Sequence, residues 1–146
     1  MALEFAFAFS FFGTPIMLGV SQVALMVYDS IELSNCAHAG AMYGMMSSTF
    51  AADSTGIQNA AQSDASDFGS NVSVTPSSYY ACSNALDGAQ YSTESAAGAV
   101  CPANASNHYL QFVKVVANMT ITPPVHCPGL PSTFTLSRTS VMEVQE

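Results

Sequence analysis

Residues 2–28, ALEFAFAFSFFGTPIMLGVSQVALMVY, are almost wholly apolar and decide the fold of this chain. Their one formal charge is Glu4, close to the start. About 20 apolar residues, each rising about 1.5 Å along a helix, span the hydrocarbon core of a bilayer. A carboxylate is costly in an apolar setting and needs a partner there. The stretch therefore predicts a membrane-inserted helix, or a helix that leaves the membrane and packs with copies of itself.

The rest of the chain has the size and composition of one small acidic domain. The chain has 146 residues, and single domains commonly contain about 100–150. Its only basic side chains are Lys114 and Arg138 against ten acidic ones, which gives a net charge of −8. Because phosphate binding needs clustered Lys and Arg, this composition argues against nucleic acid as a partner.

The first residues lack the basic side chains of a secretory leader. Such a leader carries a positive n-region before a shorter apolar stretch, whereas residues 1–4 contain no Lys or Arg. A permanent membrane anchor is also expected to carry Lys or Arg on its cytoplasmic flank. We therefore expect that a short basic leader has been removed and that residue 1 lies at or near the mature N-terminus.

The four cysteines, Cys36, Cys82, Cys101 and Cys127, have no metal-site spacing such as Cys-x-x-Cys. In an exported protein they predict two disulfides, and three connectivities are open. We favour Cys82–Cys101, which closes a Gly- and Ser-rich loop, together with Cys36–Cys127. The alternative is free, buried thiols in a reducing compartment.

One long helix is predicted from about residue 2 to about residue 50. Its second half is amphipathic, because small and apolar side chains recur there at three- and four-residue spacing. These side chains are Leu33, Cys36, Ala37, Gly40, Ala41 and Gly44. Such a stripe permits close approach of a sheet or another helix. In the apolar half, Pro15 removes one helical hydrogen bond and is expected to bend or locally melt the helix.

The remainder predicts a small head with a short helix and antiparallel strands. A capping box at Thr55 and Gln58 begins a helix that Gly69 ends. Residues 71–75 and 78–82 predict two short strands on either side of Pro76, and residues 83–105 predict loops. Alternation over residues 109–121 and 133–144 predicts two further strands.

These elements define an α+β fold with two parts. Residues 1–52 form the N-terminal helix, with residues 1–28 as the membrane or filament-core segment. Residues 53–146 form the head domain, whose antiparallel sheet covers the C-terminal half of the helix.

Motifs for catalysis, metals or cofactors are missing from the sequence. His38, His108 and His126 are scattered, and no Gly-x-Ser-x-Gly, His-Glu-x-x-His or phosphate loop occurs. We expect a non-enzymatic protein without a metal or cofactor. Three sequons, at Asn71, Asn104 and Asn118, are candidate glycosylation sites.

The N-terminal third resembles the TadE-like family, pilin-related proteins of tight-adherence secretion systems. The family pattern is Glu-Phe-Ala, a long apolar stretch, and a Leu-Ser-Asn-Ala-Ala segment that leads into Gly-Ala-x-Tyr. Here Glu4-Phe5-Ala6 and Leu33-Ser34-Asn35, followed by Gly40-Ala41-Met42-Tyr43, match in order. The resemblance covers about the first 45 residues.

This resemblance implies processing by a prepilin peptidase, membrane insertion, and extraction by pilus assembly machinery into a helical homopolymer. Glu4 would then pair with the α-ammonium of Met1 in a neighbouring subunit, with Phe5 beside it, and so set the register. The alternative for Glu4 is a favourable charge at a helix N-terminus. Phe9 and Phe12 are expected to fill the helix bundle.

We therefore expect a structural subunit of an extracellular, adhesive filament on the cell surface, which resides in the inner membrane before assembly. The alternative is a minor, membrane-held pseudopilin that primes or caps a pilus or secretion machine.

Overall fold

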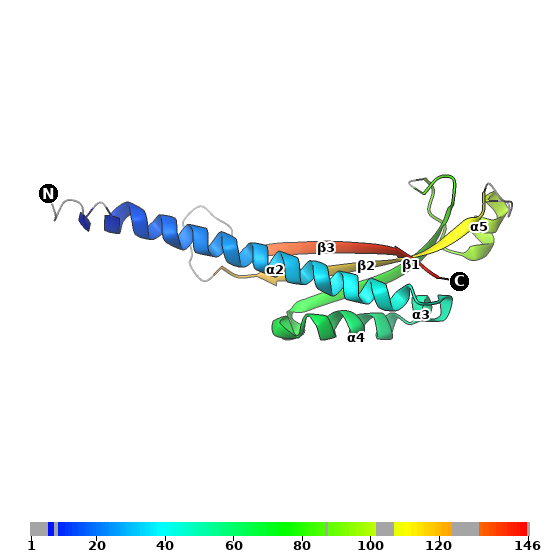
Figure 1. Cartoon of the computed structure of the whole chain (residues 1–146), viewed down its shortest axis with the longest axis horizontal. Coiled ribbons are helices and arrows are strands. Elements are labelled where there is room, and N and C mark those ends of the chain that lie inside the picture. The colour runs from blue at the N-terminus through cyan, green and yellow to red at the C-terminus, as the bar shows by residue number, and fades with distance from the viewer. Residues whose placement is uncertain (1–5, 8, 87, 102–106, 124–131, 146) are drawn as a thin grey trace.

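The computed structural model describes residues 6–7, 9–86, 88–101, 107–123 and 132–145. It is an α+β structure in which one long helix extends well beyond a small head (Figure 1). A π-helical turn, η1 (Phe9–Gly13), leads directly into the α-helix α2 (Thr14–Gly44). The N-terminal end of α2 and the lobe that contains α5 (Glu94–Val100) lie at opposite ends of the molecule.

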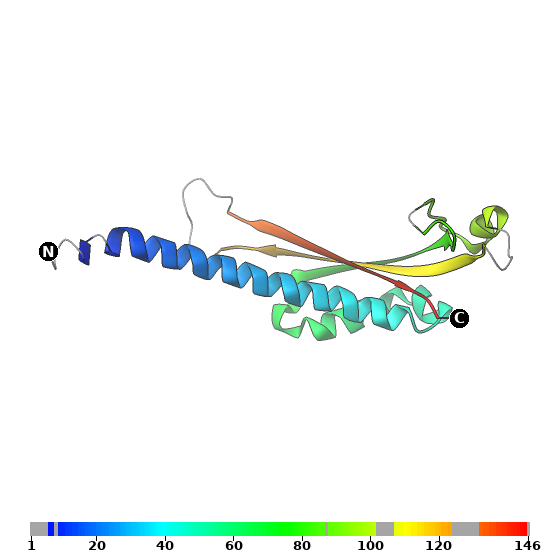
Figure 2. The same cartoon turned by 45° about the horizontal axis from the view of Figure 1, so that its top comes forward.

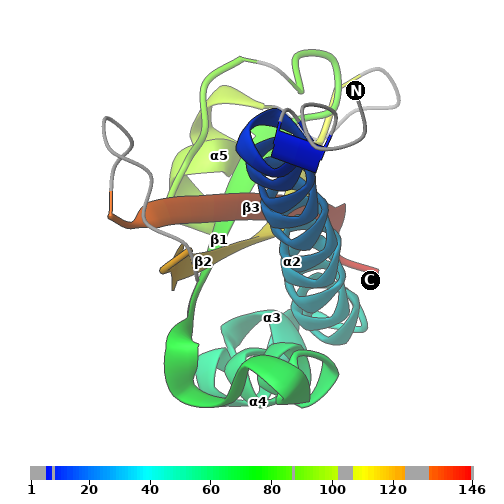
Figure 3. The same ribbon diagram turned by 90° about the vertical axis from the view of Figure 1, so that its left-hand side faces the viewer.

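The long helix ends at Gly44, earlier than the predicted residue 50. Two shorter helices, α3 (Ser48–Ala52) and α4 (Ser54–Asp64), follow it, so that the chain reverses and α4 packs beside α2 (Figure 3). The predicted capping box at Thr55 is wrong, because the cap is Asp53, whose carboxylate accepts a hydrogen bond from the Gly56 N–H. Asp53 caps better because a carboxylate also complements the positive end of the helix.

A short helix was expected to reach Gly69, but α4 ends at Asp64 and a 3₁₀ segment, η2 (Ser66–Asn71), continues from it. Gly69 lies inside this segment with a φ of +56°, the left-handed region that favours glycine. There the chain turns into the first strand.

Three strands form an antiparallel sheet in the order β1-β2-β3. They are β1 (Val72–Cys82), β2 (Tyr109–Ile121) and β3 (Phe134–Glu143). The two short strands predicted around Pro76 are one continuous strand. An edge strand accepts proline because one of its sides makes no ladder hydrogen bonds. The segment predicted as loops, residues 83–105, contains α5, which Thr93 caps.

The core lies between one face of the sheet and the helices. Figure 2 shows α2, α3 and α4 on the same side of the sheet. The buried side chains of β2 alternate along the strand as predicted: Val113, Val115, Ala117 and Met119 face the helices. They pack with the predicted stripe of α2, whose six residues are all buried.

The opposite side of the sheet, which we call the outer sheet face, carries the alternate side chains of the three strands. The pairing places them in four rows: Ser73, Asn118 and Ser137; Thr75, Val116 and Thr139; Ser77, Lys114 and Val141; Tyr79, Phe112 and Glu143.

Candidate assembly surface

The N-terminal half of α2 exposes large apolar side chains that the head does not cover. All buried residues of α2 lie from Leu33 onward. Before that point, α2 and the residues leading into it expose Phe7, Phe9, Phe11, Phe12, Ile16, Met17, Leu18, Val20, Val23, Leu25, Val27, Tyr28 and Ile31. We call this set the apolar helix surface. Figure 1 shows the N-terminal part of α2 projecting beyond the sheet.

By length and composition, the helix Phe9–Gly44 is able to cross a membrane, and it is the one such helix in the described ranges. The most apolar stretch of this helix is not buried by the rest of the described chain. A soluble protein rarely exposes so large a continuous apolar area unless that area binds something. The apolar helix surface is therefore the candidate functional site.

Of the residues predicted to set the register, Met1, Glu4 and Phe5 lie outside the described residues. The predicted packing residues Phe9 and Phe12 are 59% and 70% exposed. Their rings are thus accessible to a neighbouring helix. Phe11 and Phe12 also contact each other edge to face, with ring centroids 6.4 Å apart.

Pro15 lies in the first turn of α2, directly after the π-helical turn. A proline lacks the N–H that bonds the carbonyl four residues earlier, and its ring crowds that carbonyl. The wider π turn is a recognised way for a helix to accommodate such a disruption. The predicted effect of Pro15 therefore takes the form of a π turn over Phe9–Gly13.

Glycines allow α2 to approach its neighbours closely inside the head. A Cβ atom at Gly40 would lie 3.1 Å from the Ala61 Cβ and 3.2 Å from the Ile57 carbonyl oxygen. At Gly44 it would lie 2.9 Å from Val113 Cγ1. The small-residue stripe thus serves contacts within the chain, with both α4 and the sheet. By contrast, a Cβ at Gly19 would meet no atom within 4 Å among the residues that the structure describes, which leaves room for another molecule.

Polar contacts fix the head to α2 at both ends of the buried stripe. At the N-terminal end, Arg138 on β3 donates hydrogen bonds to the Ser30 hydroxyl and to the Ser137 carbonyl. At the C-terminal end, the Tyr43 hydroxyl donates to the Asp53 carboxylate at 3.0 Å. These contacts fix the direction in which the N-terminal half of α2 projects from the head.

Asp53 caps α4 and accepts a hydrogen bond from Tyr43, and neither role was predicted from the sequence. Its carboxylate accepts the Gly56 N–H at 2.9 Å and the Tyr43 hydroxyl, and these two hydrogen bonds, in that order, lower its pKa. Burial, followed by the hydrogen bond to Asp53, raises the pKa of Tyr43. The signal in the sequence was Asp53 three residues before Gly56, because Asp is a preferred N-cap.

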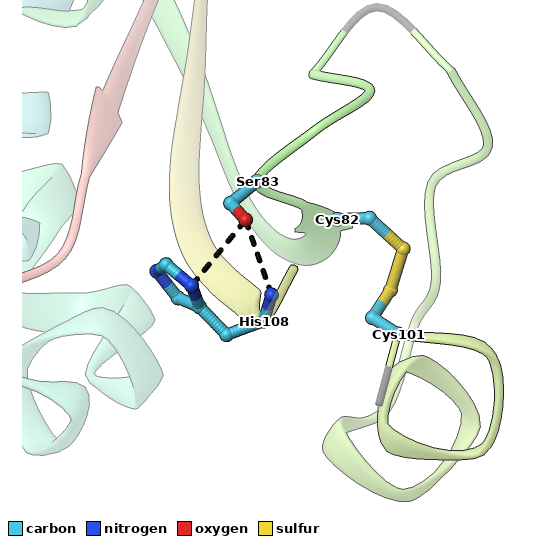
Figure 4. Close-up of a disulfide and its surroundings, with 4 residues drawn as sticks. All are labelled: Cys82, Ser83, Cys101 and His108. Carbon is cyan, nitrogen blue, oxygen red and sulfur yellow. Dashed lines mark hydrogen bonds between the residues drawn. A yellow bond between two sulfur atoms is a disulfide. The ribbon is translucent and has the colours of Figure 1, made fainter. Parts of the chain in front are cut away.

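The distal lobe is closed by the predicted disulfide Cys82–Cys101 (Figure 4). Beside it, the Ser83 hydroxyl accepts the His108 N–H at 3.1 Å and contacts the His108 Nδ1 at 3.3 Å. Tyr109 donates to Glu94 at 2.7 Å and so ties α5 to β2. The lobe is therefore held by covalent and polar contacts rather than by a large core.

The second predicted disulfide is not formed at Cys36, which carries a free thiol. Cys36 lies within the stripe that packs against α4 and the sheet, and it is fully buried. Burial and, secondarily, the negative charge of Asp64 raise its pKa to about 11. Cys127 lies outside the described residues.

The candidate glycosylation sites differ in position. Asn71 is exposed at the end of η2, and Asn118 is half-buried on the outer sheet face. Asn104 lies outside the described residues. Within the described ranges, no group of three or more His, Cys, Asp or Glu side chains is arranged to hold a metal ion.

Comparison with protein-family models, with curated proteins and with solved structures found no match.

Proposed function

We propose that this chain is a structural subunit of an extracellular pilus-like filament, whose core is a bundle of the apolar halves of α2 from many copies. The observation that carries this proposal is the division of α2 at Leu33. The head buries one face of the second half. It buries no residue of the first half, although Ile121 at the end of β2, with Thr122 and Pro123 after it, lies beside α2 near Met26. A membrane, or the same helix from other copies, has the apolarity to cover the first half.

The energy available from this surface is large enough to keep it out of water, either in the membrane or in the filament core. Fully burying a Val, Leu, Ile, Phe or Met side chain contributes about 1.5–3 kcal/mol. The apolar helix surface includes more than ten such side chains, each at least 44% exposed. Even partial burial supplies on the order of 10 kcal/mol per subunit, which is comparable to the whole stability of a small domain.

The same helix suits both the membrane and the filament. A helix satisfies its backbone hydrogen bonds internally, so it is stable in lipid and between other helices. The lipid interior and a bundle of helices are similarly apolar. Side-chain packing therefore decides whether the helix stays in the membrane or joins the bundle. Gly19, with open space around it, allows a neighbouring helix to approach closely.

Glu4 provides the register in this proposal. An unpaired carboxylate in the apolar core costs several kcal/mol, and the α-ammonium of a neighbouring subunit removes that cost. Only one axial offset between two helices brings the two groups together. The pair therefore selects one packing among many that bury similar apolar area.

The heads then coat the bundle. The sheet lies on one side of α2 (Figure 2). The strand pairing places several Ser and Thr side chains on its outer sheet face. In this arrangement the coat contacts surfaces outside the cell, and adhesion is its use.

Electron microscopy of material sheared from cells tests the proposal. We expect filaments in which mass spectrometry identifies this chain as the main repeating component. The matched control is a strain that lacks this chain alone. Filaments that remain unchanged in that strain would contradict the proposal and would support the minor, membrane-held role.

A further inference from the structure

The outer sheet face is neutral in a strongly acidic chain. Of its described side chains, only Lys114 and Glu143 carry formal charge. The other acidic residues that the structure describes lie on the helices, their caps or η2: Asp29, Glu32, Asp53, Asp64, Asp67 and Glu94. Copies of a chain with net charge −8 repel each other through most of their surface. The outer sheet face lacks this repulsion.

The apolar part of this face, which we call its apolar centre, lies in two adjoining rows. Tyr79 and Phe112 stack across the two strands, with ring centroids 5.4 Å apart and an interplanar angle of 19°. Val141 lies in the adjoining row and is 46% exposed, and Val116 lies one row further along β2, beyond Lys114. In Figure 2 the long helix and α3 and α4 all lie on the other side of the sheet. The face thus has the apolar centre that a protein contact needs.

Lys114 is the basic side chain of the outer sheet face. Arg138 donates hydrogen bonds to Ser30 and Ser137. Within the described residues, the Lys114 ammonium makes no salt bridge, although Glu143 lies on the next strand, paired with Phe112. One cation and one anion beside an apolar centre form a surface that is complementary to itself.

We propose that the outer sheet face binds the outer sheet face of a second copy of this chain, with Lys114 of each copy against Glu143 of the other. Two sheets pack face to face at about 10 Å, which brings side chains of this length into contact. A two-fold arrangement forms both charge pairs at once and stacks the apolar centres. The contact is thus both attractive and free of the repulsion that the remaining surface imposes.

The proposed function gives this contact a role, and this step alone rests on it. In a filament with α2 at its core, the outer sheet face points away from the axis. Copies that meet through it belong to different filaments. The contact therefore bundles filaments side by side.

The experiment uses the full chain in detergent micelles, which cover the apolar helix surface and leave the heads free to associate. Sedimentation at fixed ionic strength measures the association constant of the wild type and of Lys114→Glu, Glu143→Lys and the double variant. We expect each single reversal to weaken association about tenfold, because two like-charge pairs replace two attractive ones. The double variant re-forms both pairs and should recover most of the lost affinity.

Net charge alone predicts a different pattern. Lys114→Glu makes the chain more acidic and Glu143→Lys makes it less acidic, so repulsion alone would weaken the first and strengthen the second. Asp64→Lys, at the end of α4, is the matched control for Glu143→Lys, because it makes the same charge change away from the outer sheet face. It should not weaken association.

The proposal is wrong if the wild type stays monomeric at concentrations up to about 1 mM. It is also wrong if Glu143→Lys associates more tightly than the wild type, or if the double variant is no better than the single ones. None of these results depends on filament formation. Filaments that form but do not bundle would overturn the bundling role and leave the proposed function intact.

Discussion

A Cβ atom built on Gly44 lies 2.9 Å from Cγ1 of Val113, closer than side chains normally approach. The absence of a side chain at Gly44 therefore sets the distance between α2 and β2. The same glycine also faces Ile57 of α4, at 3.2 Å. Gly44 is therefore a position where both the sheet and α4 approach the helix closely.

Gly44→Ala should destabilise the head. Overpacking of a well-filled core costs about 1–3 kcal/mol, only partly offset by the better helix propensity of alanine. Thermal unfolding of the full chain in detergent, followed by circular dichroism, measures this effect. The cost should shrink in a Val113→Ala background, because that change removes the methyl groups that the new Cβ meets. Gly19→Ala is the control, since its Cβ has open space; an equal loss there would refute the explanation.

Removing the disulfide should destabilise the chain through the distal lobe. The bond joins residues 19 apart, and closing a loop of that size contributes about 3 kcal/mol in the chain-entropy model. Urea unfolding of the Cys82→Ser/Cys101→Ser variant is expected to show this loss. Reductant should destabilise the wild type and leave the variant unchanged. A reductant effect of equal size on both would place the sensitive bond elsewhere.

Asp53 should make stability depend on pH in the acidic range. Hydrogen bonds from Gly56 and Tyr43 lower its pKa in the folded state. Its contribution is therefore fully present above the ordinary carboxyl pKa of about 4 and is lost as pH falls through the lower folded value. Asp53→Ala should lower the melting temperature at pH 7, and the difference from the wild type should diminish below about pH 4. A difference that is constant across this range would rule out the ionised cap.

Tyr43→Phe is the companion variant, because it removes one of the two hydrogen bonds and keeps the ring against Phe50. It should raise the pKa of Asp53 towards its ordinary value and shift the acid loss of stability to higher pH. The Asp53 carboxyl resonance in a pH titration reports this directly.

Cys36 should react with thiol reagents only when the head unfolds. It is fully buried, and its pKa is raised to about 11, so the reactive thiolate is scarce at pH 8. In a Cys127→Ser chain, a maleimide reagent should label Cys36 slowly without denaturant and rapidly in urea. If this variant labels quickly in its native state, the stripe is not packed as described.

Glu4→Ala should leave the head folded and impair assembly, because it removes the residue proposed to set the register. Circular dichroism in detergent should be unchanged, while electron microscopy shows few or no filaments. Glu4→Gln keeps the shape and removes the charge, and it separates pairing from packing. Normal filaments in both variants would eliminate the registering role.

Local patterns predicted much of the fold. The small-residue stripe of α2 and the alternation along β2 are periodic over many residues, so each identified its buried face correctly. The disulfide Cys82–Cys101 was favoured among three open connectivities because of the loop it closes, and it is confirmed, whereas the pairing favoured for Cys36 is not formed. Shorter signals gave wrong predictions at two places. Thr55 and Gln58 fit a capping box, but Asp53 caps the helix. Residues around Pro76 were predicted as two strands, but they form one strand because an edge strand tolerates proline.

The sequence by itself determined that the chain has an apolar helix, an amphipathic continuation and an alternating sheet, because these depend on which residues recur at 3.6- and 2-residue periods. Tertiary structure decided what those faces contact. The tertiary structure placed α4 and the sheet against Gly40 and Gly44. It left Cys36 a buried free thiol. It also brought Lys114, Glu143 and the Tyr79–Phe112 pair onto one open face. Strand order and helix reversal set these neighbours, and no local period encodes them.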